Sequence, residues 1–305
     1  MAKYVCKRLG YAILTIFLIS VITFTVMNLI PGGPFLSEKA VTPATQAALE
    51  AKYGLDVPKP QQYLNYMNGL LHGDFGESLK QKGRTANDII FSTFPVSARL
   101  GGISILVALV AGVGLGSVAA MCRGKWGDQL IMVVSTLGIG VPSFVVATAL
   151  MKIFGVELKW LPTMGLSTPL HYILPVFTLA FYPMAYITRL MRSSMLDALN
   201  QDYIRTARAK GVSKFKMLFK HALRNAILPI ITYAGPLLAF TLSGSFVVEK
   251  IFNIPGLGRE FINCITGRDY PMVMSSTILL ATFLGLMNVM VDILYKIVDP
   301  RIKLR

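Results

Sequence analysis

The sequence predicts an all-α integral membrane protein with six transmembrane helices. The 305 residues are 54% hydrophobic and only 15% charged, and the mean hydropathy is +0.59. This composition is too apolar for an ordinary soluble domain. The apolar residues also gather in spans of about 20 residues or more, the length at which a helix crosses a hydrocarbon core with its backbone hydrogen bonds satisfied internally.

The first span, Tyr11–Ile30, follows basic residues and therefore has some likeness to a secretion signal. It is longer than the apolar part of a signal peptide, and Pro31-Gly32-Gly33-Pro34 follows it in place of a cleavage site of small residues. We therefore expect a retained transmembrane helix. Five further spans are expected at Ser97–Cys122, Gln129–Phe154, His171–Met191, Leu228–Val248 and Met272–Val298.

Glycine and proline interrupt several of these spans. Gly112 and Gly116 in the second span are small enough to let membrane helices approach closely. The third span contains Gly138 and Pro142, and prolines also occur in the fourth and fifth spans. We therefore expect bent or locally opened helices in these three spans.

The segment between the first two spans is polar and rich in turn residues. Thr42 and Pro43 suit the N-cap and the first position of a helix that would run through Ala51, and Gly54 suits the turn after its end. A second short helix is predicted at Gln61–Leu71. A segment of about 60 residues with two helix signals is too long for a structureless loop, so it predicts a small folded cap.

The chain therefore divides into three units. Residues 1–30 are the N-terminal tail and the first transmembrane helix. Residues 31–95 form the helical cap. Residues 96–305 form the core membrane domain, which includes a long basic loop at residues 192–227.

Lysine and arginine lie in alternate connections, which predicts the orientation of the chain. Both tails, the second connection and above all the basic loop are positively charged. The third connection carries only Lys159, and acidic residues balance the basic ones of the fifth. By the positive-inside rule, both termini and the basic loop lie in the cytoplasm, while the cap and the fifth connection lie outside.

Several function classes are excluded at this stage. The net charge of +15 does not predict a nucleic-acid partner, because the basic residues fall in alternate loops between apolar spans. The three cysteines and three histidines lack the spacing of a metal or redox site. Gly124-Lys125 is followed by Trp126, so the sequence lacks a phosphate-binding GxxxxGK[ST] loop, and no nucleophile–base arrangement is visible. We expect no metal, cofactor or catalytic residue in this chain.

The basic loop contains a short predicted helix from Tyr203 to Lys210. Asn200 or Asp202 is expected to cap its N-terminus, and Gly211 suits a left-handed residue beyond its C-terminus. A helix of this length is not stable alone. It therefore needs a partner surface.

The same helix is expected to expose Ile204, Ala207 and Gly211 between Arg205, Arg208 and Lys210. The residues from Ser213 to Ile227 predict a second, amphipathic helix on the inner leaflet. Its apolar face is predicted to consist of Phe215, Leu218, Phe219, Ala222 and Leu223. The simpler alternative is that the whole loop is an anchor on anionic lipid.

Three ionisable residues near the inner ends of spans have a plain structural explanation. Arg189 and Arg192 are expected to extend their side chains to the inner interface. Asp292 could belong to a proton relay, but such relays use chains of ionisable groups, so pairing with Lys296 is favoured.

A second candidate site lies at the end of the fifth span. Glu249 ends this span and a turn-rich apolar loop follows, which is what a re-entrant or gate-forming segment contains, although packing also explains the glycines there. The candidate gate or pathway residues are Pro142, Ser143, Phe144, Ser243, Phe246, Glu249 and Phe252.

The residues of the basic loop match a known family. Tyr203-Ile204-Arg205-Thr206-Ala207-Arg208-Ala209-Lys210-Gly211, followed by His221-Ala222-Leu223-Arg224-Asn225 and Leu228-Pro229, resembles the cytoplasmic loop of ATP-binding-cassette (ABC) importer permeases of the peptide/nickel class. Arg205 and Thr206 stand where the general consensus has Glu and Ala, which is the pattern of the peptide branch.

Further motifs resemble the B-type permease of oligopeptide importers and follow its order over nearly the whole chain. They are Pro31-Gly32-Gly33-Pro34, Tyr53-Gly54-Leu55-Asp56-Val57-Pro58, Gly73-Asp74-Phe75-Gly76, Phe94-Pro95-Val96-Ser97-Ala98-Arg99, Pro142-Ser143-Phe144, Val247-Val248-Glu249-Lys250-Ile251-Phe252, Arg268-Asp269-Tyr270 and Asp299-Pro300-Arg301.

The resemblance implies a type I ABC importer permease fold in a bacterial cytoplasmic membrane. It implies a homologous second permease that forms a heterodimer with this chain, two cytoplasmic ATPase subunits that carry ATP and Mg²⁺, and an extracytoplasmic peptide-binding protein. The residues implied to couple to the ATPases are Tyr203, Ile204, Arg205, Thr206, Ala207, Arg208, Ala209, Lys210 and Gly211.

The implied function is ATP-driven uptake of oligopeptides by alternating access. Dipeptides, glutathione or nickel chelates are alternative cargoes within the class. A secondary transporter is a more distant alternative, because it would need coupling-ion sites within the membrane, where the sequence has almost no charge apart from Asp292.

Overall fold

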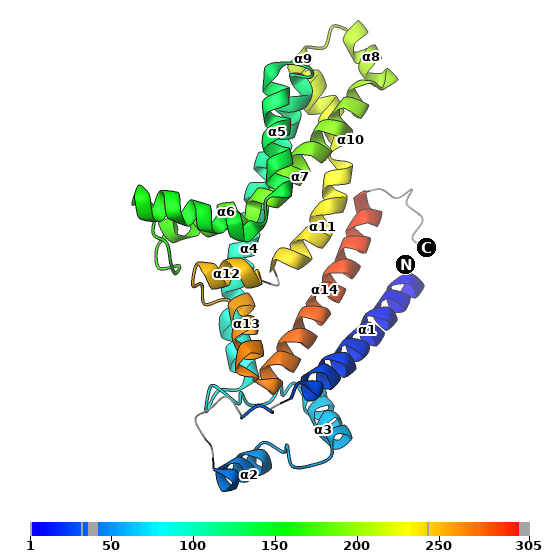
Figure 1. Ribbon diagram of the computed structural model, residues 1–305. Coiled ribbons are helices and arrows are strands. Elements are labelled where there is room, and N and C mark those ends of the chain that lie inside the picture. The colour runs from blue at the N-terminus through cyan, green and yellow to red at the C-terminus, as the bar shows by residue number, and fades with distance from the viewer. Residues whose placement is uncertain (1, 32, 36–41, 243, 299–305) are drawn as a thin grey trace.

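The computed structural model describes residues 2–31, 33–35, 42–242 and 244–298, and the regular secondary structure in these residues is helical (Figure 1). Its longest helices are α1 (Ala2–Leu29), α4 (Ala86–Met121), α7 (Ile173–Leu199) and α14 (Tyr270–Val298). α4 packs along α7, and α1 packs along α14. α11 (Leu228–Leu242) lies between the two pairs, in contact with α4, α7 and α14.

Five helical stretches among the described residues are long and apolar enough to cross a membrane, and a bent pair provides a sixth if it counts as one span. This agrees with the predicted six. The bent pair consists of α5 (Trp126–Gly140) and α6 (Ser143–Leu150), which continues into the π-helix η1 (Met151–Glu157). The chain turns by 107° between them. The break lies at Val141 and Pro142, because proline cannot donate the hydrogen bond that would continue the helix.

Several predicted spans have different bounds in the structure. α1 begins at Ala2 and not at Tyr11, and the fifth span is one α-helix only to Leu242, with α12 (Phe246–Ile251) following as a separate helix. α4 begins at Ala86 and not at Ser97, because Thr85 and Asp88 form a capping box, with Asp88 N 3.1 Å from Thr85 Oγ1. The helix continues through Pro95, so residues that the sequence analysis assigns to the cap belong to α4.

The fourth span is also longer than predicted. A 3-10 helix, η2 (Pro169–Tyr172), precedes α7, and α7 itself runs past the predicted end at Met191 to Leu199. Pro183 lies within α7 without ending it. The extension carries the chain from the membrane body to the basic loop.

The cap contains the two predicted helices, α2 (Pro43–Lys52) and α3 (Lys59–Leu71). Thr42 caps α2 as predicted, with Thr45 N donating to its Oγ1 at 3.3 Å. Gly54 follows with a φ of +64°, which glycine adopts without strain.

The cap is attached to the membrane helices by buried polar contacts. Ser20 of α1 hydrogen-bonds the hydroxyl of Tyr63 on α3 at 2.7 Å. Asp269, just before α14, accepts hydrogen bonds from the Ser78 hydroxyl and, at 3.1 Å, from the backbone N–H of Leu79. The cap is therefore joined to α1 and to the start of α14 as one unit.

The contact between α4 and α7 depends on glycines. A Cβ atom on Gly116 would lie 2.6 Å from both the Cβ of Met191 and the carbonyl oxygen of Thr188. Gly112 faces α7 in the same way, one turn earlier. The two backbones can approach this closely only because these positions have no side chain.

Gly116→Ala should destabilise the protein by about 1–3 kcal/mol, because the methyl group would force α4 and α7 apart. Gly114→Ala is the matched control, since nothing lies within 4 Å of a Cβ there and alanine favours a helix. The check is the midpoint of thermal unfolding in detergent, followed by size-exclusion chromatography. Equal midpoints for the two variants would contradict the close-packing argument.

Candidate functional site

The short helix predicted in the basic loop is α8 (Asp202–Ala209), which lies at the end of the molecule opposite the cap (Figure 1). Gly211 follows it with a φ of +73°, as predicted. The prediction that Asn200 or Asp202 is the N-cap residue of α8 is wrong. The N-cap residue is Gln201, and its side chain makes no capping hydrogen bond. Asp202 lies in the first turn.

α8 has one buried face and one exposed face. Ile204 has no exposed surface and Ala207 is only 9% exposed. Ile204 belongs to one apolar cluster with Met195 of α7 and with Met217. The expectation that α8 exposes Ile204 and Ala207 is therefore wrong, since these residues anchor it. The exposed residues of the predicted coupling stretch are Tyr203, Arg205, Thr206, Arg208, Ala209, Lys210 and Gly211.

The second half of the loop is helical but not a regular α-helix. α9 (Lys214–Lys216) begins after Ser213, whose Oγ accepts a hydrogen bond from Lys216 N at 3.4 Å. The π-helix η3 (Met217–Ala222) follows, and then α10 (Leu223–Ala226). A π-helix has more residues per turn than an α-helix, so it changes which side chains face inward.

The predicted apolar face of this half is correct only in part. Leu218 and Ala222 are buried against the core, and Met217 joins them. Phe215 is 67% exposed and Phe219 is 44% exposed, and their rings lie 4.5 Å apart. The loop is therefore packed onto the protein, and only the pair of phenylalanines remains free to enter the surface of a membrane.

Two contacts fix α8 to the membrane body besides its buried face. The Asn225 amide on α10 donates a hydrogen bond to the hydroxyl of Tyr203 at 3.0 Å. α7 leads directly into the loop, since only Asn200 and Gln201 separate it from α8. Both lie at the N-terminal end of α8, so this end of the helix is held to α7 and α10.

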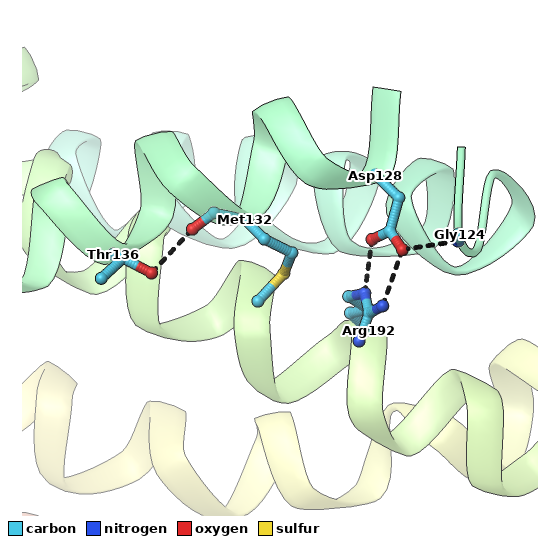
Figure 2. A network of polar contacts seen from close by, with 5 residues as sticks. All are labelled: Gly124, Asp128, Met132, Thr136 and Arg192. Atoms are coloured by element: carbon cyan, nitrogen blue, oxygen red, sulfur yellow. Dashed lines mark hydrogen bonds and ion pairs between the residues drawn. The ribbon is translucent and has the colours of Figure 1, made fainter. Parts of the chain in front are cut away.

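A buried ion pair lies on α7 just before the loop. Arg192 Nε is 2.5 Å and its terminal nitrogen 2.7 Å from the two carboxylate oxygens of Asp128 on α5 (Figure 2). Asp128 is 3% exposed and also accepts a hydrogen bond from Gly124 N at 3.0 Å. The prediction that Arg192 extends to the interface is wrong, because its guanidinium makes this two-bond contact. Arg189 is exposed, as expected.

The second candidate site is a polar centre around Glu249, which lies on α12 (Phe246–Ile251) and is 1% exposed. Its carboxylate accepts hydrogen bonds from the Ser97 hydroxyl at 2.8 Å and from the backbone N–H groups of Ser245 and Arg259, each at 3.1 Å. Ser97 in turn accepts one from Leu257 N at 2.8 Å.

This centre joins three helices. Glu249 lies on α12 and Ser97 lies on α4, while the backbone N–H groups of Leu257 and Arg259 belong to the first turn of α13 (Leu257–Gly267). The N-terminus of a helix is a favourable place for a negative charge. A Cβ on Gly256 would collide with both the Glu249 carboxylate and the Ser97 hydroxyl, so only glycine fits at this position.

The other predicted gate residues lie around this centre or at the break of the third span. Phe246 stacks on Phe261 with the ring centroids 4.9 Å apart, and Phe252 is buried in a cluster that includes Ala147 of α6. α6 packs against α12. Pro142, Ser143 and Phe144 are exposed at the start of α6. Ser243 lies outside the described residues.

Some residues of both sites could not be singled out from the sequence. Ser97 is one of many serines, and its hydrogen bond to Glu249 spans 152 positions. Asp128 had a weak signal as a lone carboxylate at the start of an apolar span. Asp292 and Lys296 lie in α14, but their side chains are outside the described part of the structure.

The described residues include potential metal ligands and the buried cysteine. They contain no group of three or more His, Cys, Asp or Glu side chains that could hold a metal ion. On α13, burial first and the nearby Asp269 carboxylate second raise the pKa of the Cys264 thiol to about 12. This thiol therefore remains protonated at physiological pH and is a poor nucleophile.

The comparison with known families gives two matches. Residues 112–304 match the family described as the binding-protein-dependent transport system inner membrane component. Residues 1–98 match the N-terminal region of the same kind of membrane component.

Close relatives cover the whole chain. The dipeptide transport system permease protein DppB of Bacillus subtilis is 46% identical over 304 residues, which is 100% of this chain and 99% of the relative. The oligopeptide transport system permease proteins OppB of Haemophilus influenzae and Escherichia coli are 45% and 41% identical, over 99% of this chain and 100% of each relative.

Solved structures share the fold of the membrane domain. The inward-facing MetNI methionine ABC transporter superposes with a TM-score of 0.56 at 15% identity, covering 69% of this chain and 96% of that one. An amino acid ABC transporter crystallised with histidines gives a TM-score of 0.53 at 17% identity, covering 71% and 95%. The predicted type I importer permease fold is thereby confirmed.

Removing one partner of the Asp128–Arg192 pair should destabilise the protein. Arg192→Met leaves the Asp128 carboxylate buried and unpaired, and we expect a cost of about 2–3 kcal/mol, less than for a fully buried pair because the Arg192 side chain is 26% exposed. Arg189→Met is the control, since it removes an exposed charge from the same helix. A double-mutant cycle with Asp128→Asn measures the coupling, and a coupling near zero would contradict the assignment.

Replacing Glu249 should loosen the turn between α12 and α13. Glu249→Gln leaves one acceptor oxygen and places an N–H₂ group among backbone donors, so we expect the amides of Ser245 and Arg259 to exchange with solvent about tenfold faster or more. Hydrogen exchange with mass spectrometry measures this directly. Glu77→Gln, at an exposed carboxylate outside this turn, is the control, and equal exchange in both variants would refute the role of the Glu249 carboxylate.

Proposed function

The chain belongs to the family of binding-protein-dependent transport system inner membrane components, and on that premise we propose that it is the permease subunit of an ATP-driven importer of short peptides. The relatives that cover the whole chain are permeases of dipeptide and oligopeptide systems. The membrane body with five or six apolar spans accords with a place in the bacterial inner membrane.

The arrangement of α8 is the observation that supports coupling to a separate ATPase. α8 presents an exposed, largely basic face while its apolar face is buried in the same cluster as α7. The sequence has no phosphate-binding loop of its own. A short helix that is rigidly held and exposed at the end opposite the cap is suited to receive force from a separate ATPase.

The proposed partners follow from the same premise. They are a homologous second permease that forms a heterodimer with this chain, two cytoplasmic ATPase subunits that bind ATP and Mg²⁺, and an extracytoplasmic peptide-binding protein. The proposed contact residues on this chain are the exposed members of the coupling stretch Tyr203–Gly211. Ile204 and Ala207 act from behind, as the anchor that keeps this face in place.

We infer alternating access as the transport mechanism. Movement of the ATPases would displace α8, and the packing of Ile204 would pass this displacement to α7. The Asp128–Arg192 pair and the close α4–α7 contact would then move α4 and α5 together with α7. A loosely attached α8 would bias no equilibrium between inward-facing and outward-facing states.

The turn between α12 and α13 is our candidate for the gate. It is an irregular segment at the end of a span, and Glu249 holds it to α4 through Ser97. Non-helical backbone at such a place is tolerated where it is buried in protein or lines a cavity. The packing of α6 on α12 joins Pro142, Ser143 and Phe144 to the same region.

The preferred cargo is an oligopeptide, with dipeptides as the first alternative and glutathione or nickel chelates as further ones. The names of the relatives support both peptide classes. Uptake of peptides of two to six residues by the reconstituted importer separates them. Uptake by this chain alone, driven by a proton gradient, would instead favour a secondary transporter.

Reversing charge on the exposed face of α8 should uncouple the importer. In proteoliposomes with all subunits, Arg205→Glu with Arg208→Glu should lower peptide-stimulated ATP hydrolysis by about tenfold or more, because both side chains would lie at the ATPase interface. Ile204→Ala should leave the ATPases bound but lower the peptide imported per ATP, because the anchor is lost.

Lys216→Gln is the matched control, since Lys216 is exposed on the same loop outside the coupling stretch. ATPase assembly and hydrolysis are measured separately, by pull-down and by phosphate release. Normal assembly and normal hydrolysis in the Arg205 and Arg208 double variant would refute the proposed contact.

A further inference from the structure

A cavity of about 750 Å³ lies beside the coupling stretch, and among its described lining residues only Arg208 also belongs to the proposed ATPase contact. It is enclosed by the ends of α4 and α7, the turn after α8 and the start of η3. Its lining includes Met121, Arg123, Leu199, Arg208, Val212 and Met217.

The charge of the cavity is positive. Arg123 and Arg208 are exposed side chains in its lining, and the described lining contains no carboxylate. Asp128, the carboxylate near Arg123, is already engaged by Arg192 at 2.5 and 2.7 Å. An anion entering the cavity therefore meets two guanidinium groups, which suit phosphate oxygens.

The rest of the lining is apolar and leads toward the membrane. Met217 is buried, Leu199 and Val212 are half-buried, and Met121 is 50% exposed at the end of α4. Met121 continues a stripe of exposed apolar residues that recurs along α4 at helical spacing. The stripe consists of Ile103, Leu106, Val107, Val110 and Val118. A soluble anion needs no such path, whereas a lipid does.

We propose that this cavity binds an anionic phospholipid of the inner leaflet. The headgroup phosphate lies between Arg123 and Arg208, and the acyl chains follow the exposed stripe of α4. Basic pockets between membrane helices on the cytoplasmic side are suited to such headgroups. The lipid bridges the α4–α5 turn and the α8–η3 turn, so it ties the coupling helix to the membrane body and shares only Arg208 with the proposed ATPase contact face.

The chain carries its own reporter for this site. Of its two tryptophans, Trp126 follows Arg123 by three positions and is 76% exposed. In the full chain with Trp160→Phe, Trp126 is the only tryptophan. Brominated phosphatidylglycerol and brominated phosphatidylcholine are titrated into nanodiscs, and quenching of Trp126 is measured. We expect phosphatidylglycerol to quench at about thirtyfold lower mole fraction, the selectivity of two basic groups worth about 1 kcal/mol each.

Three variants decide between a site and a general effect of charge. Arg123→Gln with Arg208→Gln should abolish the preference, whereas Arg123→Lys with Arg208→Lys should keep most of it. Lys216→Gln with Arg224→Gln removes the same charge from exposed positions of the loop and should leave the preference unchanged. Thermal unfolding of each variant shows that it is folded.

Two further arms identify the occupant. Soluble glycerol phosphate should not displace the lipid, and displacement would overturn the proposal in favour of a soluble anion. Binding of the ATPase subunits should leave the lipid preference intact. Its loss on assembly would show that the cavity belongs to the ATPase interface, and equal quenching by both lipids would refute the site.

Discussion

The absence of water from the membrane interior governs where this protein places its polar groups. A charge in that environment is costly unless it is paired or fully hydrogen-bonded. Asp128 meets this condition with Arg192, and Glu249 meets it with a hydroxyl and backbone N–H groups. Both carboxylates lie where the chain changes direction, the first beside the turn into α5 and the second beside the turn into α13. The few charges within the body thus fix the irregular joints between the helices.

Apolar packing holds the basic loop in place. The loop does not rest on the membrane by charge alone, because Ile204, Met217 and Leu218 insert into the cluster that also holds the end of α7. α7 is in turn held to α4 by close glycine contacts and to α5 by the ion pair. In the proposed mechanism, a displacement of α8 would pass through these contacts to α7, α4 and α5, as an ATP-driven conformational change requires.

The sequence predicts what depends on local composition and fails where a side chain's partner is distant. The spans, the cap helices, the turn at Gly211 and the break at Pro142 follow from hydropathy, capping residues and proline chemistry. The inward face of α8 does not, because a short helix with two apolar and several basic residues fits either orientation. The outward position of Phe219 accompanies the π-helix η3, which has no sequence signature. The hydrogen bond from Ser97 to Glu249 is a tertiary contact that only the assembled fold defines.

The length of α4 links the two sides of the membrane. Its 36 residues span about 54 Å at 1.5 Å per residue, whereas a hydrocarbon core is about 30 Å thick. One helix therefore reaches from the capping box beside the cap to the turn at Arg123, which the positive-inside rule predicts to be cytoplasmic. A single long helix can couple binding at one of its ends to binding at the other, and such coupling is reciprocal. Binding of a partner at the cap would change the affinity for a partner at the opposite end of α4 by some factor. Binding of that second partner would change the affinity for the first by the same factor.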